Sequence, residues 1–334
     1  MKNFWQKLHK PIFVLAPMAN VTDAAFRSLI SKYGKPDVMW TEFVSADGLC
    51  SAGMKALLVD LQYSKKEKPI IAQLFGAHPE KMKKAAALCA SLGFDGIDIN
   101  MGCPDRTIEK QGAGAATIKN LELAKEIIKA ARDGAPDLPI SVKTRIGYNK
   151  NEIETWIPEL LKENLAVLTA HLRTRKEMSD VPAHWELMKR IVEIRDEIAP
   201  QTLIIGNGGV KDLAEAKQKV KETGCDGVML GTAIFGNPWL FSGGKKSDFK
   251  NSPKSDFEEP EFLILAKERL GVLNTEYKII EEFKGEKLIG LEYEPLYPFL
   301  KDNVSGAEKD KLKNAFKVYS ADFVTTTDGT GVVH

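Results

Sequence analysis

Apolar and polar positions follow two different spacings along the first 241 residues. Short apolar runs rich in β-branched residues recur, and segments with apolar residues at helical spacing lie between them. Pro79–Leu92 and Asn120–Gly134 are two such helical segments, and glycine closes each of them. The short runs predict eight strands: Ile12–Ala16, Val38–Phe43, Pro69–Leu74, Gly96–Asn100, Ile140–Thr144, Ala166–Ala170, Leu203–Gly206 and Gly227–Leu230.

Eight strands, most of them followed by a helix, predict a (β/α)8 barrel. A doubly wound open sheet is the alternative for the same order of elements. Against that alternative, no G-x-G-x-x-G motif follows the first predicted strand. We therefore predict an α/β protein with a TIM barrel over residues 1–241.

The pattern changes after residue 241. Residues 242–260 are polar and rich in Ser, Gly, Lys and Pro, which is typical of a linker. Residues 261–334 predict a small β-rich segment with one helix near Ala266–Leu273. Its predicted strands are Phe262–Leu265, Tyr277–Phe283, Leu296–Phe299 and Phe316–Val324.

Composition narrows the class of protein. With 43% hydrophobic and 28% charged residues, the chain is typical of soluble globular proteins, and no apolar run approaches the roughly 20 residues that span a bilayer. The beginning of the chain lacks the features of a secretory signal. The four cysteines form no C-x-x-C pair and no disulfide framework. We expect a cytoplasmic protein, monomeric, with no membrane contact and no metal site. The net charge of +1 neither demands nor excludes a nucleic-acid partner.

The chemically distinctive residues fall where the predicted strands end. In a (β/α)8 barrel the active site lies at the loops that follow the strands. Each of these residues taken singly has an ordinary structural role, but their agreement across seven loops indicates one site. They are Pro17 and Met18 after the first strand, Gln73 in the third, Asn100 and Cys103 after the fourth, Lys143 and Arg145 at the fifth, His171 after the sixth, Asn207, Gly208 and Gly209 after the seventh, and Gly231 and Thr232 after the eighth.

Two groups among them suggest a cofactor. Glycines after the last two strands expose backbone N–H groups that can bind a phosphate, although a simple turn is the alternative for Gly208 and Gly209. Gln73, Lys143 and His171 would supply an amide, a cation and an imidazole, which are groups that an isoalloxazine ring needs. The ordinary alternative for each is a strand end or a solvated rim.

Cys103 stands in a Gly-Cys-Pro turn, unlike Cys89, which lies on the apolar face of a predicted helix. A thiol with a pKa of about 8.5 is mostly protonated at neutral pH and can donate a proton to carbon. The alternative, a small buried hydrophobic residue, fits Cys89 and Cys225 better.

These segments resemble the tRNA-dihydrouridine synthase family from about Pro11 to Phe241. The resemblance implies FMN bound in the barrel, NADPH as reductant, and tRNA as partner, with a uracil base reduced and Cys103 protonating C5. The motifs that carry it are Ala16-Pro17-Met18-Ala19-Asn20-Val21-Thr22-Asp23, Asp98-Ile99-Asn100-Met101-Gly102-Cys103-Pro104, Gly112–Gly114, Val142-Lys143-Thr144-Arg145-Ile146-Gly147, His171-Leu172-Arg173-Thr174-Arg175, Asn207-Gly208-Gly209-Val210 and Gly236-Asn237-Pro238-Trp239-Leu240-Phe241.

The resemblance also implies roles for single residues. Asn100 would contact the base, and Lys143 and His171 would hold flavin and base. Arg145, Arg173 and Arg175 would approach the RNA. Two positions depart from the family pattern: Leu172 stands where glycine is usual, and Thr232 stands where arginine is usual.

The end of the chain resembles something else. Ala266–Leu270, Gly290–Leu296 and above all Ala321–His334 are similar to part of the editing domain of isoleucyl-tRNA synthetase. Two alternatives to a dihydrouridine synthase therefore stay open. One is a dihydroorotate dehydrogenase-like FMN enzyme acting on a free pyrimidine, and the other is a chimeric tRNA-binding protein with an inactive barrel.

Overall fold

The structure is a computed structural model of the 334-residue chain, and it describes residues 3–242, 264–272, 277–293 and 316–320. The chain divides into two compact units, Met1–Lys250 and Asn251–His334. The division falls within residues 242–260, the segment that the sequence predicts to be a linker.

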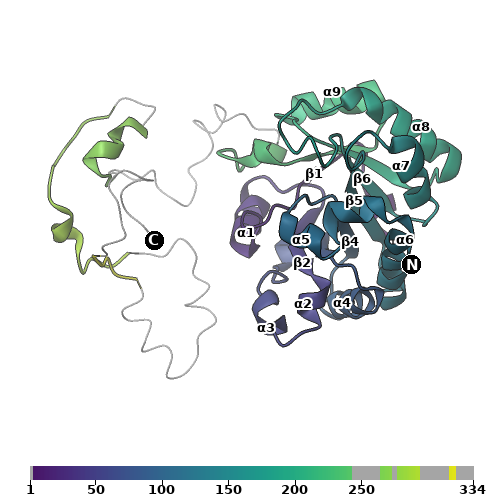
Figure 1. The fold of residues 1–334 in the computed structure, drawn as a ribbon. Coiled ribbons are helices and arrows are strands. Elements are labelled where there is room, and N and C mark those ends of the chain that lie inside the picture. Colours follow the sequence, from purple (N-terminus) through teal and green to yellow (C-terminus); the bar gives the residue numbers. More distant parts are fainter. Residues whose placement is uncertain (1–2, 243–263, 273–276, 294–315, 321–334) are drawn as a thin grey trace. The chain divides into compact units, whose positions relative to one another are not determined.

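The first unit is built on eight parallel strands with helices around them (Figure 1). The pairing order is β1-β8-β7-β6-β5-β4-β3-β2, so neighbours along the chain are neighbours in the sheet and the last strand pairs with the first. Where the chain enters β2, the N–H of Asp37 donates to the carbonyl of Phe13 at 3.0 Å, which links the two ends of the sheet. The strands are β1 (Ile12–Leu15), β2 (Met39–Ser45), β3 (Ile70–Phe75), β4 (Gly96–Met101), β5 (Ile140–Arg145), β6 (Val167–His171), β7 (Leu203–Asn207) and β8 (Gly227–Leu230).

These strands confirm the predicted (β/α)8 barrel, and each predicted strand agrees with its observed bounds to within two residues. The helices are α1 (Ala24–Tyr33), α2 (Ala46–Leu49), α3 (Met54–Leu57), α4 (Pro79–Ser91), α5 (Arg106–Lys110), α6 (Leu121–Gly134), α7 (Ile153–Leu161), α8 (Met188–Ile198) and α9 (Leu213–Thr223). Short 3-10 helices are η1 (Phe4–Lys7), η2 (Lys65–Glu67), η3 (Gly114–Lys119), η4 (Trp185–Leu187), η5 (Thr232–Ile234) and η6 (Leu240–Ser242).

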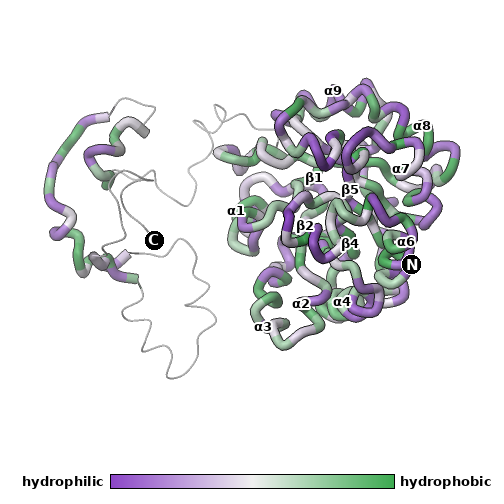
Figure 2. Tube along the Cα trace, in the orientation of Figure 1, coloured by the Kyte–Doolittle hydropathy of each residue, from purple (hydrophilic) through white to green (hydrophobic). Residues whose placement is uncertain are grey.

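Local sequence explains where the two predicted helices begin. α4 begins with Pro79, whose fixed backbone angle suits a first helical position and whose missing N–H costs nothing there. Asn120 caps α6, because its side chain accepts a hydrogen bond from the N–H of Leu123. Hydrophobic and hydrophilic stretches alternate along the helices that surround the sheet (Figure 2).

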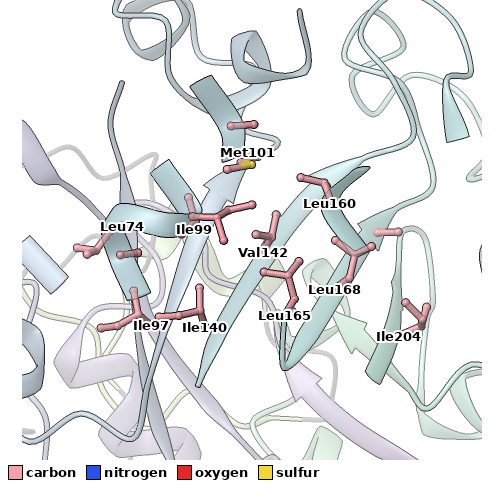
Figure 3. Packing of buried hydrophobic residues seen from close by; sticks show 14 of the residues in the cluster. Leu74, Ile97, Ile99, Met101, Ile140, Val142, Leu160, Leu165, Leu168 and Ile204 are labelled. Atoms are coloured by element: carbon pink, nitrogen blue, oxygen red, sulfur yellow. The ribbon is translucent and has the colours of Figure 1, made fainter. Parts of the chain in front are cut away.

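The two faces of each strand are buried against different partners. Ile99, Val142 and Leu168 lie in the outer core, which includes residues from the surrounding helices such as Leu160 (Figure 3). Alternate residues form an inner cluster that fills the barrel interior. Trp5 in η1 belongs to this cluster, which also contains Ile12, Val14, Ala16, Val38, Trp40, Ile71, Val167, Ile205 and Met229. Because apolar side chains occupy the interior, the polar site residues lie further along the strands, at their carboxyl ends.

The second unit differs from the predicted β-rich segment. Its described residues form η8 (Lys267–Val272), near the helix predicted there, η9 (Gly285–Leu288) and one antiparallel bridge between Glu292 and Lys317. The prediction of a strand at Tyr277–Phe283 is wrong, since these residues form no strand. Tyr277, Ile279, Ile280 and Phe283 are 52%, 49%, 68% and 39% exposed, so this apolar run lacks the buried face that stabilises a strand.

The remaining tail predictions lie mostly outside the described residues. These are the strands at Leu296–Phe299, much of Phe262–Leu265 and the end of Phe316–Val324, together with the editing-domain motif at Ala321–His334. Within the described ranges, no helix combines the length and the apolar character needed to cross a membrane.

Candidate active site

The parallel register brings the sequence-predicted polar residues to one end of the barrel. Strand neighbours in the register are Gln73 and Asp98, Asn100 and Lys143, Arg145 and His171, and His171 and Asn207. These residues alternate with outer-core positions such as Ile99 and Val142, so they share the inner face of the strands. The structure therefore gathers on five consecutive strands the side chains that the sequence places at separate strand ends.

The turn that carries Cys103 is held from two sides. The side-chain oxygen of Asn100 accepts hydrogen bonds from the N–H groups of Gly102 at 3.1 Å and of Cys103 at 2.9 Å. On the other side, the carbonyl of Cys103 accepts the N–H of Ala115 in η3 at 2.9 Å. Gly114 is required there, because its φ is +61° and a Cβ would lie 2.6 Å from the Cys103 carbonyl oxygen. The thiol is thus presented by a turn of defined geometry.

Burial raises the pKa of the Cys103 thiol above its ordinary value, and the nearby charges of Lys143 and Arg145 oppose this rise without cancelling it. Unlike an activated nucleophile, whose pKa is depressed, this thiol keeps its proton at neutral pH. Cys103 is therefore suited to donate a proton.

Lys143 lies beside Asn100 in the register of β4 and β5, as a partly desolvated cation. Burial, and then the charge of Arg145, lower its pKa to about 8, while Asp98 and Cys103 act in the opposite direction. At neutral pH most molecules still carry a protonated Lys143, but a modest rise in pH removes the charge.

His171 is neutral in this environment. Burial lowers its pKa well below the ordinary value, and the charges of Lys143, Arg145 and Arg173 lower it further. Nη1 of Arg173 lies 3.1 Å from Nε2 of His171. Because a guanidinium can only donate, Nε2 is the acceptor and the imidazole proton is on Nδ1. His171 thus presents an N–H donor from its other nitrogen.

The loop after β7 has a backbone conformation that favours glycine. Gly208 and Gly209 have φ values of +131° and +69°. A Cβ at Gly208 would lie 2.9 Å from Ala183 and 3.1 Å from the ring of His171, so a side chain has no room there. Asn207 anchors the loop, since its side-chain amide donates to the carbonyl of Met229 at 2.8 Å. The phosphate-binding role predicted for these glycines stays a prediction.

The loops after β1 and β8 lie side by side. The sulfur of Met18 is 3.9 Å from the place a Cβ would take on Gly231, and the N–H of Ala16 donates to the carbonyl of Leu230 at 2.7 Å. Pro17 precedes Met18 and is half-buried, whereas Thr232 is exposed at the start of η5. These residues close the ring of loops around the barrel end.

The chain is similar to proteins of a known family. The chain matches the family model described as dihydrouridine synthase over residues 14–318. The chain belongs to the dihydrouridine synthase family. It is therefore an oxidoreductase of a flavin-dependent family, and the sequence prediction of this family is confirmed. The match extends past Phe241, where the sequence motifs end, and reaches into the second unit.

Curated relatives of the dihydrouridine synthase family are similar over most of the chain. A probable tRNA-dihydrouridine synthase 2 of Bacillus subtilis (strain 168) is 39% identical over 307 residues, which are 91% of this chain and 88% of the relative. A probable tRNA-dihydrouridine synthase of Staphylococcus aureus (strain COL) is 43% identical over 242 residues, which are 72% and 73% of the two chains. A solved structure of a variant of NCR from Zymomonas mobilis is similar to 73% of this chain and 87% of its own, at 16% identity and a TM-score of 0.48.

The three arginines that the family resemblance assigns to RNA have partners within the protein. Arg145 is 6% exposed, and it donates to the carbonyls of Gly102 at 2.9 Å, Thr174 at 3.0 Å and Met178 at 2.9 Å. Burial lowers its pKa to about 10, so it remains a cation at neutral pH. Arg145 therefore ties the Cys103 turn to the loop after β6, and its predicted contact with RNA stays a prediction.

Arg173 and Arg175 lie in that same loop after β6. Arg173 donates through Nε to the carbonyl of Val181 at 2.6 Å, and its Nη2 lies 3.5 Å from the place a Cβ would take on Gly209. Arg175 forms a two-pronged ion pair with Glu109 of α5, and its guanidinium stacks over the ring of Tyr148, 5.5 Å from the centroid. Their predicted contact with RNA stays a prediction.

Leu172, which departs from the family pattern, is buried in the outer core at 0% exposure. Leu172 directly follows the last residue of β6, and its N–H donates to the carbonyl of Asn207 at 2.9 Å, so the backbone stays paired with β7 and the larger side chain is accommodated. This departure leaves the inner face of β6 unchanged.

Sequence reasoning missed the carboxylate beneath these residues. Asp98 is 1% exposed and accepts hydrogen bonds from Nε2 of Gln73 at 2.6 Å and from Oγ of Ser141 at 2.5 Å. Burial raises its pKa to about 6, although both hydrogen bonds and the charge of Lys143 favour the ionised form. The signal was present in the sequence, because Asp98 stands two residues before Asn100 and must share its inner face.

Proposed function

We propose that this chain reduces the C5–C6 double bond of specific uridines in tRNA, with FMN as bound cofactor, NADPH as reductant and Cys103 as general acid. The observation that carries the proposal is the protonated thiol of Cys103, held by two backbone hydrogen bonds at the end of a dihydrouridine synthase barrel. The names of the relatives, which are tRNA-dihydrouridine synthases, support tRNA as the substrate.

The residues present fit FMN. Gly208 and Gly209 offer a loop without side chains, as a phosphate requires, and Lys143 and His171 offer a cation and a neutral N–H donor for the ring. Arg173 lies beside Gly209 and can supply the positive charge that Thr232 does not. The chemistry that bound FMN supplies is hydride transfer to C6 of the base, after its own reduction by NADPH.

The chain's own residues supply the rest of the reaction. Cys103 gives its thiol proton to C5 of the base, and the rise of its pKa on burial keeps that proton available. Lys143 stabilises negative charge that develops nearby while it remains protonated. Gln73 and Asn100 each use one amide N–H within the protein and keep a second N–H, so both can still bind flavin or base.

The substrate base must leave the folded tRNA to enter this site. Cations around the barrel end would then contact phosphates, and we place the half-buried Arg173 and Arg175 and the exposed Lys119 in this role. Lys119 is exposed and lies 4.3 Å from the centroid of the Tyr148 ring, close to Arg175. Such a reaction would take place on cytoplasmic tRNA, with the protein acting as a monomer.

One assay tests the proposal against its alternatives. The purified protein is incubated with NADPH and tRNA that lacks dihydrouridine, and in parallel with orotate and with dihydroorotate. Dihydrouridine detected by mass spectrometry only in the tRNA reaction supports the proposal. Turnover of the free pyrimidines alone would favour the dihydroorotate dehydrogenase-like alternative. A colourless protein that binds tRNA but takes up no FMN would favour the inactive barrel.

A further inference from the structure

A continuous chain of hydrogen bonds links the buried Asp98 to the Cys103 turn. Oδ2 of Asp98 accepts a hydrogen bond from Nε2 of Gln73 at 2.6 Å. Oε1 of Gln73 accepts Nδ2 of Asn100 at 3.1 Å. Oδ1 of Asn100 accepts the N–H groups of Gly102 and Cys103 at 3.1 and 2.9 Å. Three side chains from β3 and β4 thus connect the barrel interior to the backbone of the reactive thiol.

The ionised carboxylate of Asp98 determines which group donates and which accepts in every hydrogen bond of this chain. An ionised carboxylate only accepts hydrogen bonds, so it requires the NH2 end of Gln73. The carbonyl end of Gln73 then faces Asn100 and requires the NH2 end of that amide. The carbonyl end of Asn100 is left for the two backbone N–H groups, which need an acceptor. A reversed amide at either step would place two donors against each other.

We propose that Asp98 is a positioning residue, which fixes the Cys103 turn by setting the orientation of the Gln73 and Asn100 amides. Asp98 is 1% exposed, so any effect that it has on the Cys103 turn must pass through the residues that it contacts. The proposal rests on the proposed function only for the chemical role of Cys103. The position of the turn can be measured without flavin or tRNA.

The four cysteines allow that measurement within one chain. Cys103 is half-buried and reports the turn, while the exposed Cys50 serves as an internal reference for the reagent. Cys89 and Cys225 are 0% and 2% exposed, so they react only if the barrel opens generally. Iodoacetamide labelling followed by peptide mass spectrometry gives a separate rate for each thiol.

Three substitutions separate the chain of hydrogen bonds from general packing. Asp98→Leu removes the acceptor that orients Gln73. Asp98→Asn removes the charge but keeps an acceptor oxygen, and its NH2 group can donate to Ser141, whose hydroxyl lies 3.4 Å from the carbonyl of Ile97. Ser141→Ala removes the other hydrogen bond to Asp98, of 2.5 Å, and leaves the chain to Cys103 intact.

We expect Asp98→Leu to raise the labelling rate of Cys103 about fivefold or more, the scale of one lost hydrogen bond. Cys50 should keep its rate, and Cys89 and Cys225 should stay protected. Asp98→Asn and Ser141→Ala should label Cys103 at nearly the rate of the unmodified protein, which also excludes an effect of the lost charge on the thiol pKa. In tRNA assays, Asp98→Leu should slow base reduction while NADPH oxidation continues.

The proposal is overturned if folded Asp98→Leu labels Cys103 at the unmodified rate, or if Cys89 and Cys225 become reactive together with it. It is also overturned if Ser141→Ala or Asp98→Asn loosens the turn as much as Asp98→Leu. Should Asp98→Leu fail to fold, Gln73→Met removes both hydrogen bonds of the Gln73 amide, to Asp98 and to Asn100, and the Cys103 rate in that variant decides by the same criteria. Failure of the tRNA assay with the expected labelling pattern would count against the proposed function alone.

Discussion

Glu109 of α5 accepts hydrogen bonds from the guanidinium of Arg175 through both of its carboxylate oxygens, although the two residues are 66 positions apart. The pair joins the loop after β4 to the loop after β6 beside the Cys103 turn. Arg175 therefore enters any encounter with tRNA already bound to a carboxylate, and its charge is partly neutralised.

Replacing Glu109 with Gln should strengthen tRNA binding, because it removes a negative charge and frees the guanidinium of Arg175 for a phosphate. The slope of log binding constant against log salt should steepen by about one unit for each additional phosphate that the protein neutralises. Filter binding at several salt concentrations measures both effects. Glu154→Gln is the matched control, since Glu154 holds Arg190 in a similar two-pronged pair between α7 and α8. Equal effects of the two substitutions would contradict a specific role for Arg175.

Cys103→Ala should leave FMN binding and NADPH oxidation intact, because the thiol acts only on C5 of the base. Dihydrouridine formation should fall at least about 100-fold, the scale of a lost general acid. Single-turnover reduction of tRNA by the reduced protein measures this step directly. Cys50→Ala, which removes an exposed thiol, should change nothing. An unchanged rate in Cys103→Ala would remove the thiol from the mechanism.

The affinity for FMN should fall as the pH rises through about 8, because Lys143 carries its charge below that pKa and loses it above. A decrease of about tenfold between pH 7 and 9.5 corresponds to losing one modest charge interaction. Quenching of flavin fluorescence across this range measures it. Lys143→Met should bind FMN more weakly at pH 7 and show no such step. The same step in Lys143→Met would assign it to another group.

Asp98→Asn should gain stability relative to the unmodified protein as the pH rises. The pKa of Asp98 is about 6 in the folded protein against an ordinary value of 3.8, so the folded state binds the proton more tightly. The unmodified protein therefore loses stability as the pH rises from about 4 to about 6, and Asp98→Asn does not lose it. The full shift of about two pKa units corresponds to about 3 kcal/mol in the free energy of unfolding, of which about 2 kcal/mol falls between pH 4.5 and pH 7. Urea unfolding of both proteins at pH 4.5 and 7 gives the difference between their free energies of unfolding at each pH. The contributions of the other carboxylates are the same in both proteins and cancel in this difference. A constant difference would refute the raised pKa.

Gly208→Ala should weaken FMN binding by about tenfold or more, because a Cβ would lie 2.9 Å from Ala183 and displace the loop after β7. Gly224→Ala is the matched control. Gly224 also has a positive φ of +75°, but it caps α9, and the nearest atom to its Cβ position is 3.9 Å away. Both variants should lose some stability, measured by thermal melting, and only Gly208→Ala should lose FMN. Equal FMN affinity in the two would exclude this loop from the cofactor site.

The sequence by itself determined the barrel and the position of the Cys103 turn. Strand positions follow from short apolar runs rich in β-branched residues, and such runs are visible in the sequence itself, as at Gly96–Asn100. The glycines and the thiol can be recognised in the sequence because the motifs that contain them lie within a few residues of each strand end. The tail prediction failed at Tyr277–Phe283, where an apolar run has no buried face to stabilise a strand.

Only the tertiary structure decided how these residues act. Asp98 meets Gln73 from 25 positions away, and Arg145 meets Met178 from 33, because the register and the inner face of the barrel bring them together. The same burial sets the protonation of Cys103, Lys143 and His171, since the cost of a charge depends on the surrounding medium and not on neighbours in the chain. Periodicity along a sequence identifies which face a side chain takes, whereas its partners and its charge state depend on what the closed barrel places opposite it.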